Sequence, residues 1–231
     1  MRGVIDALHA NWIRFVVFLS TGTLPPGADL ATISAQTDPI AWAHAQVELN
    51  LGAVFGAKGF AAVHPAFFAT NASTWWGDAL PTGEVGMIAP DTLVDWITQD
   101  DMGKVCAAIL GAGAVKDGDD EAMWLVGPKK VSLRDGAAAI ARAAFPENEQ
   151  LKVKQITADE EVEGQVARGM PRHIARHLAE SLTKLKDMQN GGLDWMPEGD
   201  ACEEAVAAVE RYTGEPPMTL PWWIEKYKGD F

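Results

Sequence analysis

With 231 residues, 48% of them hydrophobic, the chain is long enough to bury a sizeable core, which excludes global disorder. Its formal net charge of −13 at pH 7 argues against binding to nucleic acid or to an anionic membrane surface, because it offers no basic excess to phosphates. We expect neither a membrane span nor a signal peptide, and therefore a cytoplasmic protein.

The first part of the chain predicts a strand, a helix and a second strand. Residues 1–11 have a helical pattern, and the apolar run from Phe15 to Ser20 is typical of a parallel strand covered on both faces. An Asp-Pro pair at 38–39 begins a second helix that ends in the segment Gly-Ala-Lys-Gly at 56–59, and residues 60–64 form the next strand. The short connections predict a right-handed crossover.

The rest of the chain predicts one more core strand followed mainly by helices. Residues 71–100 form an irregular excursion rich in tryptophan and glycine, and Asp100 or Asp101 caps a helix that runs to Leu110. The later elements are a strand at 122–127, a helix at 133–144 capped by Ser132, a small edge strand at 152–156 and mainly helices at 158–231.

These elements predict an α/β fold with a partial Rossmann-like parallel sheet, made of later strands only, and a smaller C-terminal helical region. We place the sheet domain at 1–130, including the excursion, and the helical substrate or lid region at 131–231. Ligands of such sheets lie at the carboxyl ends of the strands, here at 20–21, 64–65 and 127–128.

Four polar residues near these strand ends are candidates for acid–base catalysis. His44 and Glu48 have the i, i+4 spacing that lets an imidazole and a carboxylate share a proton on one helix face; an ordinary surface pair is the alternative. His64 ends a strand at the usual address of a ligand contact, and Ser20 ends the preceding strand, where its hydroxyl either contacts a ligand or caps a turn.

Other residues suggest a flat ligand and no metal. Nine tryptophans are many for this length, and indoles gathered near a cleft favour a flat apolar ligand, although they also fill cores. Cys106 and Cys202 lie far apart in alanine-rich helical patterns, as free buried thiols do. His173 and His177 have the spacing of a metal pair, but the flanking arginines favour a solvated helix face.

Several short stretches, in their order and spacing, carry a family resemblance. They are VIDA at 4–7, RFVVFLST at 14–21, HAQVE at 44–48, HPAFFATN at 64–71, DWITQDDMG at 95–103, LVGP at 125–128 and YTG at 212–214. Together they resemble the NmrA-like branch of the atypical short-chain dehydrogenases, which includes the ergot-alkaloid-type reductases.

The resemblance implies an enzyme of secondary metabolism that delivers a hydride from NADP(H) to an imine, iminium or enone of a flat, alkaloid-like molecule. It implies cofactor contacts at Thr21, Pro65 and Phe67, and substrate contacts at Phe68, Asn71, Trp75 and Trp76, although the aromatic residues also suit a core. The family's usual Arg-Pro is His64-Pro65 in this chain, and the usual tyrosine proton donor is absent, since Ile40 occupies its position.

The family's first half, with its strand, glycine-rich turn and helix, has no counterpart in the matching stretches. The segment Gly-Ala-Gly at 111–113 follows a helix and precedes a loop, so it does not fit a phosphate-binding turn. We therefore expect the strand at 15–20 to have one free edge, covered by a second copy in a homodimer or by the missing half supplied elsewhere. A cofactor-independent cyclase or isomerase using His44 and His64, and a non-catalytic regulator, are the alternative functions.

Overall fold

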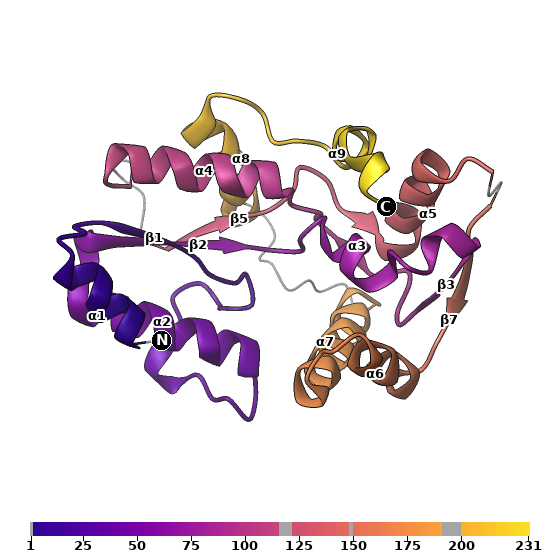
Figure 1. Ribbon diagram of the computed structural model, residues 1–231, viewed down its shortest axis with the longest axis horizontal. Coiled ribbons are helices and arrows are strands. Elements are labelled where there is room, and N and C mark those ends of the chain that lie inside the picture. The colour runs from indigo at the N-terminus through magenta and orange to yellow at the C-terminus, as the bar shows by residue number, and fades with distance from the viewer. Residues whose placement is uncertain (1, 116–121, 148–149, 191–199) are drawn as a thin grey trace. The chain divides into compact units, whose positions relative to one another are not determined.

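The computed structural model describes residues 2–115, 122–147, 150–190 and 200–231 (Figure 1). It divides into two compact units, each assembled from three separate segments of the chain. The first unit consists of Met1–Ala66, Gln99–Val126 and Glu203–Pro217, and the second of Phe67–Thr98, Gly127–Cys202 and Met218–Phe231. The units therefore alternate along the chain, whereas the sequence pattern predicts two domains with a single boundary at residue 130.

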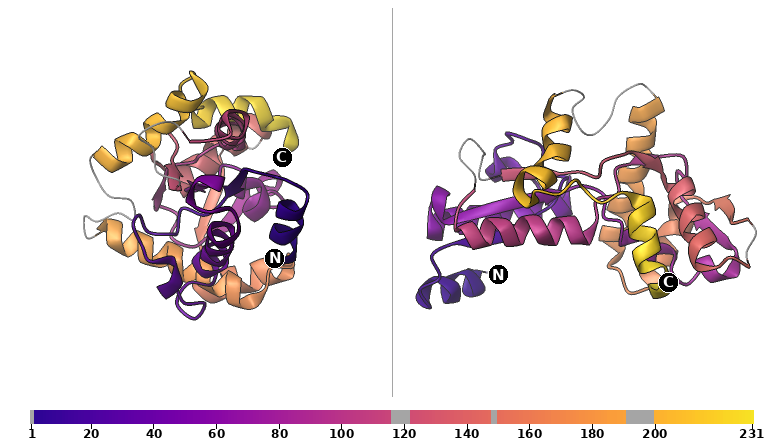
Figure 2. Two further views of the ribbon diagram at one scale, coloured as in Figure 1. Left: turned by 90° about the vertical axis from the view of Figure 1, so that its left-hand side faces the viewer. Right: turned by 90° about the horizontal axis from the view of Figure 1, so that it is seen from above.

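The first unit contains the predicted parallel sheet. Its strands β1 (Val16–Leu19), β2 (Phe60–Pro65) and β5 (Ala122–Leu125) lie in the order β1-β2-β5, with Leu19 opposite Val63 and His64 opposite Trp124. Helix α4 (Gln99–Ala112) contacts β1 and β2, and α2 (Pro39–Phe55) contacts β2. Figure 1 shows these helices on opposite sides of the strands, and α4 lies alongside the strands in the right view of Figure 2. The predicted α/β class is confirmed.

Local sequence signals explain the ends of α2. The Asp38 side chain accepts a hydrogen bond from the Ala41 amide at 2.8 Å, Pro39 occupies the first turn, and Gly56 ends the helix with a φ of 72°. Helix α1 (Arg2–Ala10) precedes β1, and most of α8 (Asp200–Thr213) also belongs to this unit.

Two predictions about the first unit need correction. Strand β1 is half-buried rather than covered on both faces, and Leu19 is 41% exposed, because β1 lies at the edge of the sheet. Helix α4 begins at Gln99, so Asp100 and Asp101 lie inside its first turn instead of capping it. Their charges still suit that position, since carboxylates are favourable near a helix N-terminus.

The second unit is more regular than predicted for residues 71–100. That segment contains α3 (Asn71–Trp76), β3 (Glu84–Met87) and β4 (Leu93–Val94). Strand β3 pairs in parallel with the predicted edge strand β7 (Lys152–Gln155), and β4 pairs antiparallel with β6 (Val131–Ser132). The remaining helices, α5 (Leu133–Ala144), α6 (Ala158–Ala167), α7 (Arg172–Asn190) and α9 (Leu220–Tyr227), agree with the helical pattern expected there. Among the described residues, no helix combines the length and the apolar character that a membrane span requires.

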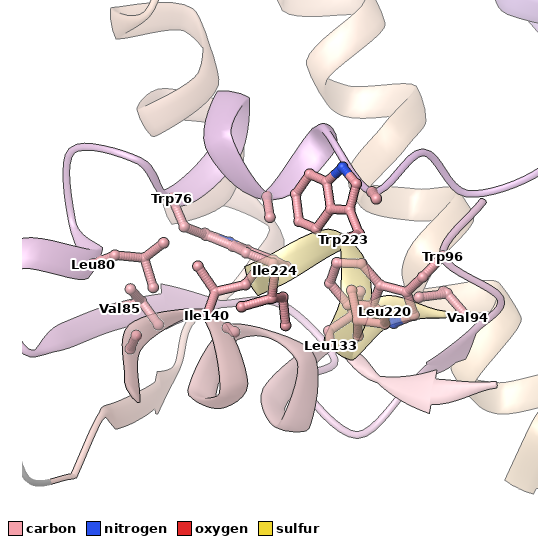
Figure 3. Close-up of a cluster of buried hydrophobic side chains, with 14 of the residues drawn as sticks. Trp76, Leu80, Val85, Val94, Trp96, Leu133, Ile140, Leu220, Trp223 and Ile224 are labelled. Atoms are coloured by element: carbon pink, nitrogen blue, oxygen red, sulfur yellow. The ribbon is translucent and has the colours of Figure 1, made fainter. Parts of the chain in front are cut away.

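Tryptophans form much of the core of the second unit. Figure 3 shows Trp76, Trp96 and Trp223 among the aliphatic side chains of β3, β4, α5 and α9. Gly136 of α5 leaves room for Trp96, because a Cβ atom added at this glycine would clash with the Trp96 Cζ2 atom.

The close approach at Gly136 gives a stability prediction. Gly136→Ala should lower the free energy of unfolding by about 1–3 kcal/mol, since the added methyl group overpacks the core. Gly103 of α4 is the matched control, because its Cβ meets nothing within 4 Å. Gly103→Ala should raise stability by about 0.5–1 kcal/mol, through helix propensity alone. Urea unfolding followed by circular dichroism measures both; equal effects of the two substitutions contradict the packing argument.

Candidate functional site

Three of the predicted polar residues meet at the carboxyl edge of the parallel sheet. Ser20 directly follows β1, His64 belongs to β2, and Glu48 reaches the same point from α2. The Ser20 hydroxyl donates a hydrogen bond to Oε1 of Glu48, and His64 Nε2 lies 3.5 Å from the same oxygen. All three side chains are buried, Glu48 being 5% and His64 1% exposed. We call them the Ser20–Glu48–His64 cluster.

One hydrogen bond of the His64 ring shows which nitrogen carries a hydrogen. Its Nδ1 is 3.0 Å from the carbonyl oxygen of Thr21, and because a carbonyl only accepts, Nδ1 carries a hydrogen. The other nitrogen, Nε2, is buried without a hydrogen-bond partner and faces Glu48. Glu48 thus accepts the Ser20 hydrogen bond and faces Nε2 of His64 within one buried polar cluster.

The surrounding backbone fixes this cluster in place. The Ser20 amide donates to the Val63 carbonyl at 2.7 Å, and the Gly22 amide donates to the Pro65 carbonyl at 2.8 Å. A Cβ atom at Gly22 would lie only 2.8 Å from the Pro65 oxygen, so this approach requires glycine. The imidazole of His64 stacks on the indole of Trp124, with ring centroids 4.6 Å apart at 26°. Backbone hydrogen bonds thus join the ends of β1 and β2 and the turn after β1 into one edge.

His44 does not form the predicted pair with Glu48. Its Nδ1 lies 2.9 Å from the Ile40 carbonyl, one turn earlier in α2, and its ring lies 5.9 Å from that of Phe18. A helical side chain leans toward the N-terminus of its helix, which brings the imidazole to Ile40. Glu48 lies instead among the buried positions of α2. The histidine partner of Glu48 is His64, which sequence spacing did not indicate.

The predicted aromatic contacts gather in the second unit. Phe67 makes edge-to-face contacts with Trp75 at 5.4 Å and with Trp96 at 5.2 Å, and Trp75 contacts Trp76 at 6.0 Å. Trp76 is buried in the core cluster, whereas Phe68 and Asn71 are half-buried. The structure therefore forms two groups of candidate residues, one in each unit. Trp195, one of the nine tryptophans, lies outside the described residues.

The second unit also contains a cavity that the sequence did not indicate. Its volume is about 290 Å³, and Lys186 at its wall donates a hydrogen bond to the Asp91 carbonyl at 3.2 Å. The lining residues are Ile88, Ala89, Pro90, Asp91, Gln155, Thr183, Lys186, Asp187 and Asn190. They come from three distant segments, so no local pattern could have revealed the cavity.

The helix starts beside the parallel sheet of the first unit do not fit a dinucleotide's pyrophosphate. Such a site needs a glycine-rich turn that leads from a strand directly into a helix N-terminus. The turn after β1 leads instead to a short 3₁₀ helix at Leu30–Thr32, the first turn of α2 is capped by the Asp38 carboxylate, and α4 begins with Asp100 and Asp101. These carboxylates would repel a phosphate.

Cys106 and the pair His173 and His177 suggest no further chemistry. Cys106 is a free, half-buried thiol in α4, and burial raises its pKa, which favours the unreactive thiol. The side chain of Cys202 is outside the described part of the chain. Arg172 and Arg176, beside His173 and His177, pair with Glu163 and Asp159 at 2.5 and 2.7 Å on the surface of α6 and α7. Within the described ranges, no group of three metal-ligating side chains is placed to hold an ion.

Comparisons with known proteins show the fold. No family model matches the sequence, and no curated protein matches it. The NADPH-dependent quinone oxidoreductase from Escherichia coli, solved with NADPH, is 19% identical with a TM-score of 0.63, over 97% of this chain and 69% of that one. Triphenylmethane reductase of Citrobacter sp., solved with NADP(H), is 13% identical with a TM-score of 0.64, over 98% of this chain and 69% of that one.

A third solved structure extends this likeness beyond the reductases. A nucleoside-diphosphate-sugar epimerase from Staphylococcus aureus is 12% identical with a TM-score of 0.62, over 96% of this chain and 68% of that one. At these identities the likeness establishes a shared Rossmann-like architecture, in agreement with the predicted fold class.

Proposed function

We propose that this chain is an NmrA-like, NAD(P)H-dependent reductase that acts on a flat, apolar small molecule. The observation that carries the proposal is the Ser20–Glu48–His64 cluster at the carboxyl edge of a sheet with the fold of NADPH-dependent reductases. This edge is where folds of this type place their ligands. The context of ergot-alkaloid-type secondary metabolism and a cytoplasmic location belong to the proposal and rest on the sequence resemblance.

The chain's own residues would supply a proton. Reduction of an enone adds a hydride to one atom and a proton to another, so a reductase of this kind needs a proton source. Because Glu48 and His64 are buried, we assign them a positioning role: they fix the turn at Ser20. His44 is half-buried and closer to solvent, and we propose it as the general acid.

The aromatic side chains would bind the substrate. Phe68, Asn71 and Trp75 are partly exposed, which suits ligand contact, whereas the buried Trp76 can act only as support for them. Thr21, Pro65 and Phe67 remain the proposed neighbours of the dinucleotide. The helix starts of the first unit offer no grip for its pyrophosphate.

A turnover assay with NADPH tests the proposal. The acceptors are a quinone, a triphenylmethane dye and a cyclic iminium compound, and NADPH oxidation is followed by its absorbance. We expect one of the acceptors to be reduced, at a rate that stays linear in NADPH into the millimolar range because the phosphate grip is weak. His44→Ala should lower kcat about 100-fold or more, while the exposed His173→Ala should leave it unchanged. If NADPH is not oxidised in the presence of any of the three acceptors, the result contradicts the proposed reductase.

A second candidate is an acid–base enzyme that needs no dinucleotide, such as a cyclase or isomerase. The poor fit to a pyrophosphate favours it. Conversion of the iminium compound without NADPH, lost in His44→Ala and retained in His173→Ala, identifies this function. Absence of turnover in both assays leaves the non-catalytic regulator.

A further inference from the structure

The cavity of the second unit is lined by helix α7 and by the loop that follows β3. Thr183, Lys186, Asp187 and Asn190 line it from α7, and their i, i+3, i+4, i+7 spacing places them on one face of the helix. The loop at 88–91 forms another wall. The cavity volume of about 290 Å³ corresponds to roughly ten water molecules at about 30 Å³ each, so it suits a small ligand.

The loop at 88–91 is held in place by backbone hydrogen bonds. The Thr92 amide donates to the Ala89 carbonyl at 3.0 Å. The Arg134 amide donates to the Pro90 carbonyl at 2.8 Å. Ala89 has a φ of 46°, a left-handed backbone angle that a residue with a Cβ atom seldom adopts. A wall that is fixed before binding lowers the ordering cost of binding a ligand.

Two opposite charges on the cavity wall have no ion partner among the described residues. Lys186 directs its ammonium group to a neutral acceptor, the Asp91 carbonyl, which leaves two of its three hydrogens available. The carboxylate of Asp91 pairs with Arg134 at 2.9 Å, so its charge is already compensated. The Asp187 carboxylate accepts no hydrogen bond from the described part of the chain. A ligand that carries both charges would therefore complement the wall.

The other lining groups also match a ligand of this kind. The Thr183 hydroxyl donates to the Ala179 carbonyl at 3.0 Å, which leaves its oxygen free to accept from an ammonium group. The side-chain amides of Gln155 and Asn190 have no partner within the ranges that the structure describes, and each can donate or accept. Residues 88–90, an isoleucine, an alanine and a proline, offer an apolar surface to an aliphatic group.

We propose that this cavity binds a small zwitterion of the amino-acid class. Its carboxylate pairs with Lys186, its ammonium group with Asp187, and its aliphatic side chain lies on residues 88–90. A flat apolar acceptor would leave both charges without a partner, so this site differs in its chemistry from the proposed reductase site. A neutral polyol would satisfy the hydrogen bonds but not the charges. Charge-assisted hydrogen bonds are about twice as strong as neutral ones, which favours the zwitterion.

Titration of the isotope-labelled chain with L-leucine, followed by the chemical shifts of its backbone amides, tests the site. We expect a Kd on the order of 1 mM, because a ligand of this size makes few contacts. The shifts should gather at residues 88–91 and 183–190. Leucinamide, which lacks the carboxylate, and isocaproate, which lacks the ammonium group, should each bind about tenfold more weakly or worse. Glucose, a neutral polyol, should cause no shifts.

Two variants that each remove one charge have matched controls on the same helix. Lys186→Met should raise the Kd for L-leucine about tenfold or more. Lys184→Met should leave it unchanged, because Lys184 is exposed on α7 but does not line the cavity. Asp187→Asn should weaken binding to a similar extent, and Glu180→Gln, also exposed outside the cavity, is its control.

Several outcomes would overturn the amino-acid site. They are the absence of shifts at about 20 mM L-leucine, a concentration far above the expected Kd, and shifts that gather outside the cavity wall. Leucinamide or isocaproate binding as tightly as L-leucine would remove the charge argument, as would equal effects of a variant and its control. Shifts with glucose but not with L-leucine would make the cavity a polyol site instead.

Discussion

Replacing Glu48 by alanine is expected to lower the free energy of unfolding by about 3–5 kcal/mol, because removal of one partner leaves the other polar groups buried and uncompensated. The Ser20 hydroxyl loses its acceptor, and His64 Nε2 faces an empty site in a position where the ring is only 1% exposed. Urea unfolding followed by far-ultraviolet circular dichroism measures the loss.

A second variant separates the charge of Glu48 from its shape, and a third serves as a surface control. Glu48→Gln keeps an acceptor for Ser20 and should cost less, about 1–3 kcal/mol. Glu210 of α8 is an exposed glutamate of the same unit, and Glu210→Ala should change stability by no more than about 0.5 kcal/mol. If Glu48→Ala costs no more than Glu210→Ala, the cluster is not a buried polar network.

The parallel sheet of the first unit could be predicted because its signals are local. The run at 15–20 and that at 60–64 are β-prone, and Asp38, Pro39 and Gly56 give the helix between them a definite start and end. A helix between the two strands then leaves parallel pairing of β1 with β2 as the natural arrangement. The pairs β3–β7 and β4–β6 join distant segments, and neither composition nor periodicity shows such pairing.

The candidate site was predicted in its residues but not in its contacts. Ser20, Glu48 and His64 were each singled out by position, yet the i, i+4 spacing favoured His44 as the partner of Glu48. The pairing of Glu48 with His64 depends on two features that the sequence of a single helix does not reveal. The register of β1 on β2 brings His64 level with the turn after Ser20, and Glu48 lies on the face of α2 that is buried.

The structure places several tryptophans in a core, whereas the sequence suggested that they bind a ligand. A flat apolar ligand was inferred from their number, but Trp76, Trp96 and Trp223 fill the core of the second unit (Figure 3). Sequence alone gives no distinction between an indole that packs on a ligand and one that packs on a helix. The distinction depends on small neighbours such as Gly136, which are recognised only once α5 is placed against Trp96.

Trp96→Ala is therefore expected to act on stability and lower the free energy of unfolding by about 3–5 kcal/mol. Trp96 is 1% exposed, its Nε1 donates to the Val131 carbonyl at 2.9 Å, and its ring contacts those of Phe67 and Trp76. Truncation removes these contacts, opens a large cavity beside α5 and leaves the carbonyl without its donor. Urea unfolding of the purified variant gives the size of the loss.

Trp222 is the matched control, since it lies in α9 of the same unit but is 73% exposed. Trp222→Ala should stay within about 0.5 kcal/mol of the unmodified protein. The ligand interpretation makes the opposite prediction for Trp96: stability would be retained, and binding of a flat apolar acceptor would be lost. A Trp96→Ala protein that unfolds at the normal urea concentration but no longer binds or reduces the acceptor would show that this indole belongs to the binding site, because a core tryptophan cannot be removed without cost to the fold.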